Sequence, residues 1–170
     1  MDNDYNSFTK TAIHRNSLSK PAEYLWHSRL LIGSILDYGC GYGYDVIELT
    51  EMGCNGRGYD KYNEAFLNEE VLSCMYDTVM CNYVLNVIPS KEKVREIIVL
   101  LRSIGKNIYI SVRSDSNSIQ EYWDYDEDNE GYWTMSGSFQ RFYTNNMIEE
   151  CCGNVEILRT TSTYKLFKLI

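Results

Sequence analysis

The sequence predicts an α/β fold, in which a doubly wound, mostly parallel sheet lies between two layers of helices and ends in an antiparallel C-terminal strand. Short apolar segments typical of strands alternate with segments of helical spacing along most of the chain. A glycine-rich turn joins the first expected strand to a helix, and the last two strand-like segments are close enough to form a hairpin. This order is typical of a three-layer α/β domain with an antiparallel edge.

The elements follow from local signals. A first helix is expected to start at Pro21 with Ser19 as its N-cap, and its apolar stripe continues to about residue 31. After the second strand the pattern is poor, since residues 65–72 could form one helix and no strand is evident. The other expected strands and helices cover residues 35–38, 44–52, 56–59, 77–82, 90–101, 106–112, 144–150, 155–158 and 164–169.

The length of 170 residues suits one hydrophobic core. We expect an N-terminal arm over residues 1–18 and a single domain over residues 19–170, with an inserted loop over 114–138. The apolar runs are too short for a membrane-spanning helix, and the acidic start argues against a secretory signal. Six cysteines without a C-x-x-C pair, and only two histidines, indicate reduced thiols in the cytoplasm and no metal site.

The net charge of −8 excludes a protein that binds nucleic acid through a generally basic surface. Six acids lie within residues 121–130, and the rest of the chain has 18 acids and 16 bases. Residues 10–20 contain three Lys or Arg and one His without any acid, so a local basic groove stays open. Residues 121–133 alternate aromatics with acids, which fits a solvated loop, a lid, or a surface for a cationic partner.

The strongest motif is Asp37-Tyr38-Gly39-Cys40-Gly41-Tyr42-Gly43, between an expected strand and a helix. Glycines allow a sharp turn and a close approach of the backbone to a ligand. The spacing is G-x-G-x-G and not the G-x-G-x-x-G of nicotinamide-dependent oxidoreductases, which makes that class a distant alternative. The carboxylate two residues before the first glycine suits a cationic ligand group better than a pyrophosphate. A purely structural turn is the other interpretation.

Asp60 ends the second expected strand, where a carboxylate can accept hydrogen bonds from both hydroxyls of a ribose. An isolated Asp at such a place is more often a loop or cap residue. Because it follows the glycine turn, we favour the ribose role.

The chain resembles the class I S-adenosylmethionine-dependent methyltransferases in residues 35–43, 58–60, 77–89 and 107–111. The resemblance implies a Rossmann-like methyltransferase fold, S-adenosylmethionine as cofactor and S-adenosylhomocysteine as product. In it, Asp37 and the glycine turn hold the methionine part and Asp60 the ribose. The next two residues border the adenine, and two residues after the fourth strand lie beneath the sulfonium. The cofactor positions are Asp37, Gly39, Cys40, Gly41, Gly43, Asp60, Lys61, Tyr62, Asn82 and Tyr83.

The sequence departs from this family in two places. Sixteen residues separate Asp60 from Asp77, too few for the family's usual helix and third strand with their loops, so we expect that strand to be shortened or missing. The segment Asn82-Tyr83-Val84-Leu85 lacks the Pro-Pro-aromatic motif of amino-methylating DNA enzymes, so that mechanism is unsupported.

A narrower resemblance is to methyltransferases associated with DNA phosphorothioation systems. The similar blocks are residues 10–15, 18–21, 37–41, 82–88 and 137–144. Members of that subgroup are usually longer, and the resemblance says little about the methyl acceptor.

Six polar residues are candidates for the acceptor side. His14 could act as a general base near neutral pH, or lie exposed on the arm. Arg15 and Arg141 could bind a phosphate or carboxylate, or be solvated. Tyr143 could pack with its polar tip exposed. We assign His14, Asn86 and Tyr143 to catalysis and Arg15, Gln140 and Arg141 to substrate binding. Cys40 and Cys81 have no evident base partner for nucleophilic catalysis.

The sequence therefore predicts a methyltransferase that uses S-adenosylmethionine. Its acceptor stays open between a small molecule and nucleic acid. The main alternative is a non-catalytic relative that binds S-adenosylmethionine or a partner protein in a regulatory role. The short stretch after Asp60 and the missing acceptor motif motivate this alternative.

Overall fold

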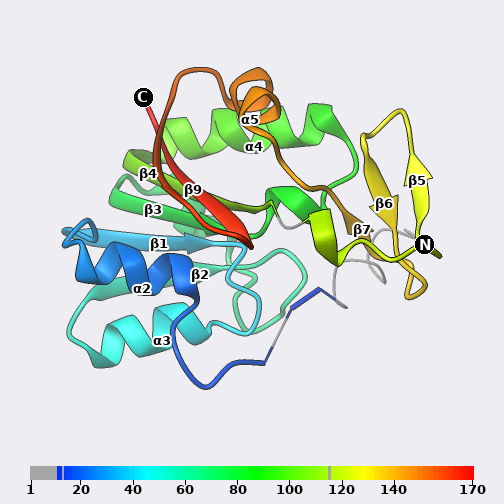
Figure 1. The fold of residues 1–170 in the computed structure, drawn as a ribbon. Coiled ribbons are helices and arrows are strands. Elements are labelled where there is room, and N and C mark those ends of the chain that lie inside the picture. Colours follow the sequence, from blue (N-terminus) through cyan, green and yellow to red (C-terminus); the bar gives the residue numbers. More distant parts are fainter. Residues whose placement is uncertain (1–10, 13, 115) are drawn as a thin grey trace.

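The computed structural model describes residues 11–12, 14–114 and 116–170 (Figure 1). Residues 1–10 of the expected arm and Ile13 lie outside the described residues, and of these Lys10 and Ile13 belong to the narrower resemblance and the basic segment. The described part of the arm has no helix or strand until α2 begins at Lys20. The proposed division into arm and domain stays a prediction.

The main sheet has six strands in the order β2-β1-β3-β4-β9-β8 (Figure 1). Neighbours from β2 to β4 pair in parallel, whereas β9 pairs antiparallel with both β4 and β8. The fold class predicted from the sequence is therefore confirmed. The strands are β1 (Ser34–Tyr38), β2 (Asn55–Tyr59), β3 (Tyr76–Asn82), β4 (Gly105–Arg113), β8 (Val155–Thr160) and β9 (Tyr164–Leu169).

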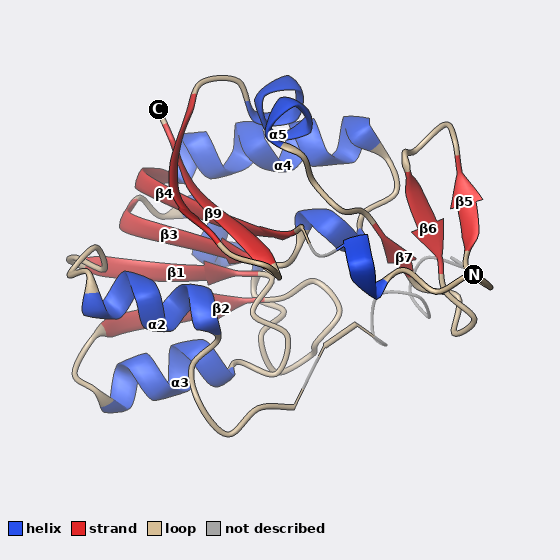
Figure 2. Ribbon diagram, viewed as in Figure 1, coloured by secondary structure: helices blue, strands red, loops and turns tan. Residues whose placement is uncertain are grey.

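Helices cover both faces of this sheet (Figure 2). Alternate residues of each strand point to opposite faces, so Ile35 packs in the core under α2 and α3 and Leu36 in the core under α4 and α5. The same alternation separates Met80 from Val79 on β3. The helices are α2 (Lys20–His27), α3 (Tyr44–Glu51), α4 (Lys91–Ile104) and α5 (Asn145–Cys152).

The predicted cap of the first helix is confirmed, since the Ser19 hydroxyl accepts a hydrogen bond from the backbone of Ala22. The expected continuation to residue 31 is wrong. Arg29 has a positive φ of 57°, and Leu30 N–H donates to the carbonyl of Leu25, which turns the chain out of the helix. The break thus comes before Gly33, through the left-handed conformation of an arginine.

The stretch after β2 contains no strand between residues 60 and 75, all of which are described. This confirms the expectation that the third strand is missing and leaves β2 at the edge of the sheet. A helix over residues 65–72 was a wrong expectation, because only a short 3-10 helix, η1 (Glu69–Ser73), forms there. The Phe66 ring occupies the space beside Gly43 and Gly58, so this segment folds back over the glycine turn.

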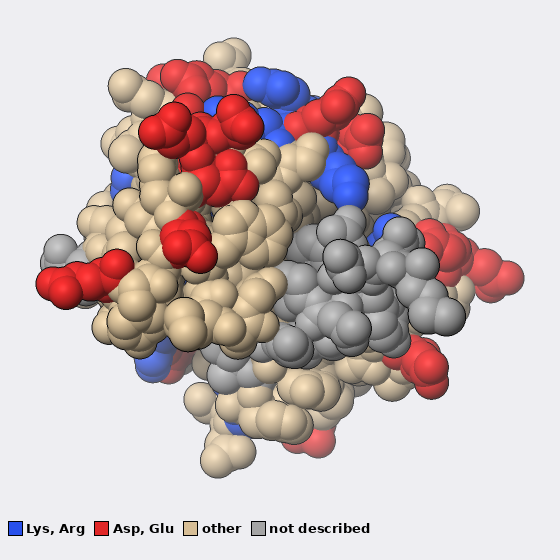
Figure 3. Space-filling model, turned by 90° about the vertical axis from the view of Figure 1, so that its right-hand side faces the viewer, with Lys and Arg blue, Asp and Glu red and all other residues tan. Residues whose placement is uncertain are grey.

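The insertion after β4 is more ordered than a plain loop. It contains a 3-10 helix, η3 (Ser116–Ser118), and, with the residues after it, a separate sheet of β5 (Asp124–Asp126), β6 (Gly131–Trp133) and β7 (Phe139–Gln140). The Asp126 carboxylate holds the β5–β6 hairpin by accepting from Trp133 Nε1 at 3.0 Å and Asn129 Nδ2 at 2.9 Å. Acidic side chains outnumber basic ones on the face of the molecule that includes this sheet (Figure 3).

Candidate functional site

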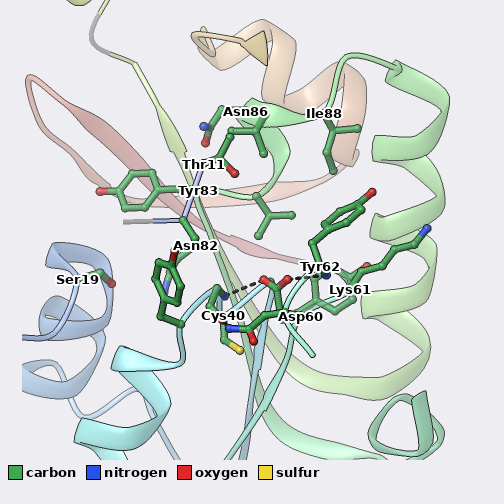
Figure 4. Close-up of a pocket in the computed structure, with 18 of the residues that line it drawn as sticks. Thr11, Ser19, Cys40, Asp60, Lys61, Tyr62, Asn82, Tyr83, Asn86 and Ile88 are labelled. Carbon is green, nitrogen blue, oxygen red and sulfur yellow. Dashed lines mark hydrogen bonds between the residues drawn. The ribbon is translucent and has the colours of Figure 1, made fainter. Parts of the chain in front are cut away.

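A cavity of about 1290 Å³ opens at the carboxyl ends of β1, β2, β3 and β4. In a doubly wound sheet this edge is where ligands bind. Eleven of the residues predicted for the site line it: Arg15, Gly39, Cys40, Gly41, Asp60, Lys61, Tyr62, Asn82, Tyr83, Asn86 and Gln140. Figure 4 shows several of them around the opening between the glycine turn and the segment after β3.

The glycine turn is fixed by its own hydrogen bonds. Gly39 N and Cys40 N both donate to the carbonyl of Tyr59, at 2.7 and 3.1 Å. Gly39 and Gly41 have φ angles of 74° and 57°, which favour glycine. A Cβ on Gly39 would also collide with the side chain of Val84, so the turn packs directly against the segment that follows β3.

Asp60 links this turn to the end of β2 (Figure 4). Its carboxylate accepts from Gly41 N at 2.7 Å and from Tyr62 N at 2.8 Å. A carboxylate has about four lone-pair positions, so two stay available for hydroxyl donors in the cavity. The geometry fits a group that binds the two hydroxyls of a ribose.

Asp37 lies at the end of β1 beneath the turn and is 3% exposed. Burial, followed by the nearby Asp45 carboxylate, raises the pKa of the Asp37 carboxyl well above 3.8, and Arg15 opposes this shift. No described residue donates a hydrogen bond to the Asp37 carboxylate in the structure. A buried acid with two acidic neighbours, Asp45 and Asp60, is suited to receive a cationic group.

Asp45, on α3, organises the arm beside the cavity. Asp45 is 2% exposed, and its two carboxylate oxygens accept hydrogen bonds from Ser19 N and Ser19 Oγ, both at 2.6 Å. Arg15 Nη1 lies 3.7 Å from Asp45 Oδ2, and Arg15 Nε is buried without a hydrogen-bond partner. The guanidinium is therefore held near the turn with unused donor capacity.

The opposite wall comes from β3 and η2 (Leu85–Val87). Asn82 Oδ1 accepts from Ser111 Oγ at 2.9 Å, while Asn82 Nδ2 and Asn86 Oδ1 are buried without partners. Tyr83 adopts a φ of 60°, a strained conformation for a tyrosine, which turns the chain out of β3 at the cavity. Two unpaired amide atoms beside a strained turn indicate a place prepared for a polar ligand.

Lys61 and Tyr62 lie toward the α4 side of the cavity (Figure 4). Lys61 Nζ is 5.8 Å from the centroid of the Tyr62 ring, and Ile97 and Leu100 of α4 line the same region. An aromatic ring and two aliphatic side chains suit a flat, apolar group such as a nucleobase.

Five predicted site residues lie outside the cavity lining. Asp37 is beneath the turn, and Gly43 caps α3 with a φ of 76°. His14 is exposed on the arm, where its ring stacks on Tyr42 at 4.2 Å and its Nδ1 lies 2.8 Å from the Tyr44 hydroxyl.

Tyr143 and Arg141 are buried and donate hydrogen bonds to the chain's own carbonyls. Burial raises the pKa of Tyr143, which is 2% exposed, and its hydroxyl donates to the carbonyl of Leu85. The Arg141 side chain is fully buried, and its guanidinium donates to the carbonyls of Asn129, Ile88 and Pro89. It holds the small sheet to the segment after η2.

Sequence reasoning missed Asp45, Asn63 and Arg113 as residues of this region. Asn63 Nδ2 donates to Gly41 O at 2.7 Å, and Arg113 lines the cavity with its Nη1 3.3 Å from Gln140 Oε1. Acids are common in the first turn of any helix, so Asp45 carried no distinct signal. Asn63 and Arg113 belong to no motif, and only folding brings them to the turn and to Gln140.

Other kinds of site find no support in the part of the chain that is described. All six cysteines are free thiols, and burial raises the pKa of both Cys40 and Cys81. No cluster of His, Cys, Asp or Glu suited to a metal ion occurs among the described residues. No helix within the described ranges is long and apolar enough to cross a membrane.

The chain is similar to known proteins in sequence family and in fold. Residues 4–151 match a family model described as a methyltransferase domain. A search of curated proteins gave no match. The CcbJ methyltransferase from Streptomyces caelestis is 9% identical and aligns over 96% of both chains with a TM-score of 0.62.

Two further solved structures share the fold. The 1,6-didemethyltoxoflavin N1-methyltransferase from Burkholderia thailandensis, with bound 1,6-didemethyltoxoflavin and S-adenosylhomocysteine, is 15% identical. It aligns over 88% of this chain and 76% of that one, with a TM-score of 0.63. Magnesium protoporphyrin IX methyltransferase from Synechocystis PCC 6803 is 18% identical over 86% of this chain and 78% of that one, with a TM-score of 0.55. Sequence identities of 9–18% show a shared fold and no more.

Proposed function

Because the chain belongs to the methyltransferase domain family, we propose that it transfers a methyl group from S-adenosylmethionine to an acceptor and releases S-adenosylhomocysteine. One observation carries the choice of cofactor. The Asp60 carboxylate, which accepts a hydrogen bond from Gly41 N, lines the cavity, while the buried Asp37 lies beneath the same turn. The ribose of this cofactor requires a group that accepts hydrogen bonds from its hydroxyls, and the ammonium requires an acid.

The positions of the other proposed cofactor residues, in or next to the cavity, support their assignment. Lys61 and Tyr62, on the α4 side of the cavity, suit the adenine. Gly39, Cys40 and Gly41 line the cavity from the turn, and Gly43 ends the turn with a positive φ. Asn82 at the end of β3 and Tyr83 directly after it line the opposite wall. The cofactor supplies a methyl group on an electrophilic sulfonium. The residues of this chain align the acceptor and exclude water, which can provide much of the rate in such a displacement.

We infer a small-molecule acceptor that binds beside Asn82, where Asn86 and Gln140 complete the wall. The buried, unpaired Asn86 Oδ1 supports a donor group on the acceptor. The Burkholderia relative in the comparison binds 1,6-didemethyltoxoflavin, also a small molecule. Nucleic acid is the second acceptor class, supported by the basic residues 10–20 and by the narrower sequence resemblance. The free thiols support a location in the reducing cytoplasm.

A non-catalytic, regulatory relative is the second candidate function. The stretch between Asp60 and Asp77, which lacks a strand, favours it because one wall of the adenine site is reduced. Methyl transfer from labelled cofactor into the DNA, RNA, protein or small-molecule fraction of an extract separates the two functions. Label in one fraction supports the enzyme and identifies its acceptor class, while binding of S-adenosylhomocysteine without any transfer supports the regulatory relative.

Calorimetric titration with S-adenosylhomocysteine tests the cofactor directly. We expect the wild type to bind and Asp60→Ala to bind at least about tenfold more weakly, since hydrogen bonds to a charged group are lost. Asp124→Ala is the matched control, because Asp124 is an exposed acid on the small sheet. A folded wild type that does not bind would overturn the proposal.

A further inference from the structure

Three carboxamide side chains line the part of the cavity that the cofactor residues after β2 leave open: Asn82, Asn86 and Gln140. Figure 4 shows Asn86 and Tyr83 on one side of the opening and Asp60 on the other. A carboxamide is uncharged, and it offers one carbonyl oxygen and one NH2 group for hydrogen bonds. The hydrogen bonds that these groups already make determine what a ligand can add.

The side chain of Asn86 has both of its hydrogen-bonding atoms unused. Asn86 is 2% exposed, and its Oδ1 is buried without a partner. Its Nδ2 has no hydrogen-bond partner among the described residues either. Exchanging the positions of nitrogen and oxygen would leave the same two atoms unpaired. Because a buried amide without partners costs free energy, a ligand with one donor and one acceptor would stabilise this side chain.

The orientation of the Gln140 amide is fixed by Arg113. Arg113 Nη1 donates to Gln140 Oε1 at 3.3 Å. A guanidinium only donates hydrogen bonds, so the oxygen of Gln140 must face it. Arg113 is itself held by the Ser118 hydroxyl at 2.8 Å and lies 5.0 Å from the centroid of the Phe142 ring. The Gln140 nitrogen, which has no partner among the described residues, is thus left as a donor.

Backbone and side-chain contacts hold the three amides along one wall. Arg141 N donates to Asn86 O at 2.7 Å, which places β7 beside η2. Asn82 Oδ1 accepts from the hydroxyl of Ser111, which lies two residues before Arg113 on β4. Asn82 Nδ2 is buried without a partner and is a further donor. These links make the wall a fixed arrangement of neutral groups.

Charged side chains do not dominate this wall. The acids of the lining come from the segment after β2 or from α4: Asp60, Glu64 and Glu96. The base in contact with the amides, Arg113, is already engaged by Gln140 and Ser118. A neutral polar group therefore fits the wall better than an ion.

We propose that Asn86 and Gln140 determine the specificity for the methyl acceptor, and that they bind a neutral, planar small molecule through a lactam or carboxamide edge. Such an edge has an N–H group next to a C=O group. The N–H donates to the carbonyl oxygen of Asn86, and the C=O accepts from the amide nitrogens of Asn86 and Gln140. Asparagine and glutamine bind the donor–acceptor edge of a nucleobase in the same way. This inference rests on the proposed function and names the acceptor class.

The surroundings favour a small molecule over a nucleobase within a strand, although both carry this edge. Gln140 belongs to β7, and the same small sheet contains the acids Asp124 and Asp126. Their charge opposes a phosphate backbone.

The test uses 2-quinolone, a planar lactam, as the probe. Ligand-observed NMR titration measures its binding to wild type saturated with S-adenosylhomocysteine. We expect 2-quinolone to bind about tenfold more tightly than N-methyl-2-quinolone, which lacks the N–H, and than quinoline-2-carboxylate, which is an anion. A single-stranded oligothymidylate, which carries the same edge on a phosphate backbone, should not displace 2-quinolone.

Two variants test the residues. Asn86→Leu, which has a similar volume and no amide, should bind 2-quinolone about tenfold more weakly and still bind S-adenosylhomocysteine. Urea denaturation should show it to be at least as stable as wild type, because an unpaired buried amide is removed. Gln140→Met should also bind 2-quinolone more weakly. Asn146→Leu is the matched control, since Asn146 is exposed on α5, and it should bind as wild type does.

Other outcomes overturn the inference. If wild type binds S-adenosylhomocysteine but binds none of the three quinoline probes, or all of them equally, the edge is not recognised and the proposed function stands. Unchanged binding of 2-quinolone by Asn86→Leu would show that Asn86 does not contact the acceptor, and if that variant does not fold, unchanged binding by Gln140→Met decides in the same way. Displacement by oligothymidylate would make the acceptor a nucleic acid. If folded wild type does not bind S-adenosylhomocysteine, the proposed function itself fails.

Discussion

The carboxylate of Asp60 accepts a hydrogen bond from the backbone N–H of Gly41, with 2.7 Å between oxygen and nitrogen. This contact joins the end of β2 to the turn that follows β1, two elements that meet only because their strands are parallel neighbours. One side chain therefore shapes the turn and offers its remaining lone pairs to the cavity. Changes at Asp60 should affect the stability of the empty protein as well as ligand binding.

Asp60→Asn should lower the free energy of unfolding by about 1–2 kcal/mol without any ligand. In asparagine, one of the two oxygens that accept from Gly41 N and Tyr62 N becomes an NH2 group, which cannot accept a hydrogen bond. Urea denaturation followed by circular dichroism measures this. Asp124→Asn, an exposed acid without such contacts, should stay within about 0.5 kcal/mol of wild type. Equal stability of Asp60→Asn and wild type would show that the contact does not hold the turn.

Asp37→Asn should stabilise the empty protein and weaken its binding of S-adenosylhomocysteine. The raised pKa of the buried Asp37 carboxyl means that the folded protein keeps a proton that the unfolded chain has released. Its contribution to stability therefore falls as pH rises from the ordinary value of 3.8 through the raised pKa. The stability advantage of Asp37→Asn should grow over the same interval, as denaturation at a series of pH values will measure.

The same residue predicts the sign of the pH dependence of binding. A cationic ligand group favours the ionised Asp37, so the affinity of wild type should rise with pH and binding should release a proton. Titrations in buffers of different ionisation enthalpy measure that proton, and Asp37→Asn should not release it. A proton taken up by wild type on binding would contradict this role.

Much of the fold could be predicted from sequence, because it depends on local periodicity. The strands of residues 35–38 and 77–82, the Ser19 cap and the missing third strand all follow from spacing, cap chemistry and length. The early end of α2 could not, because it depends on the conformation of Arg29. The order within residues 114–138 depends on a carboxylate, Asp126, that pairs with residues in a later turn and strand.

The site residues that belong to local sequence motifs could also be predicted, whereas those that depend on long-range packing could not. The glycine turn is a contiguous motif and Asp60 directly follows the next strand, so the sequence indicated them, and the structure brings Gly39, Cys40, Gly41 and Asp60 to one cavity. The surroundings of Arg141 and Tyr143 are set by long-range packing, which the sequence does not reveal. A polar residue type alone therefore suggested a ligand role for side chains that are buried against the chain's own carbonyls.

Gly43→Ala should destabilise the protein by about 3 kcal/mol or more and weaken cofactor binding. Gly43 has a φ of 76°, and a new Cβ would collide with the Phe66 ring that covers the turn. Gly53→Ala is the matched control, because Gly53 has a φ of 90° with open space around its Cβ position. It should cost only the backbone strain, about 1–2 kcal/mol, with unchanged affinity. Urea denaturation and titration measure both; equal losses in the two variants would mean that Phe66 moves freely.

Arg141→Met should act through stability and not through recognition of an anion. The guanidinium is fully buried, so its loss leaves the carbonyls of Asn129 and Pro89 without their donor. We expect a loss of about 3–5 kcal/mol in the free energy of unfolding. Arg159→Met, an exposed arginine that only lies over the Tyr24 ring, should change it by less than about 1 kcal/mol. Chemical denaturation gives these values, and titration of Arg141→Met below its unfolding transition should show near-wild-type affinity for S-adenosylhomocysteine. A stable variant that loses only methyl transfer would instead place Arg141 among the substrate-binding residues.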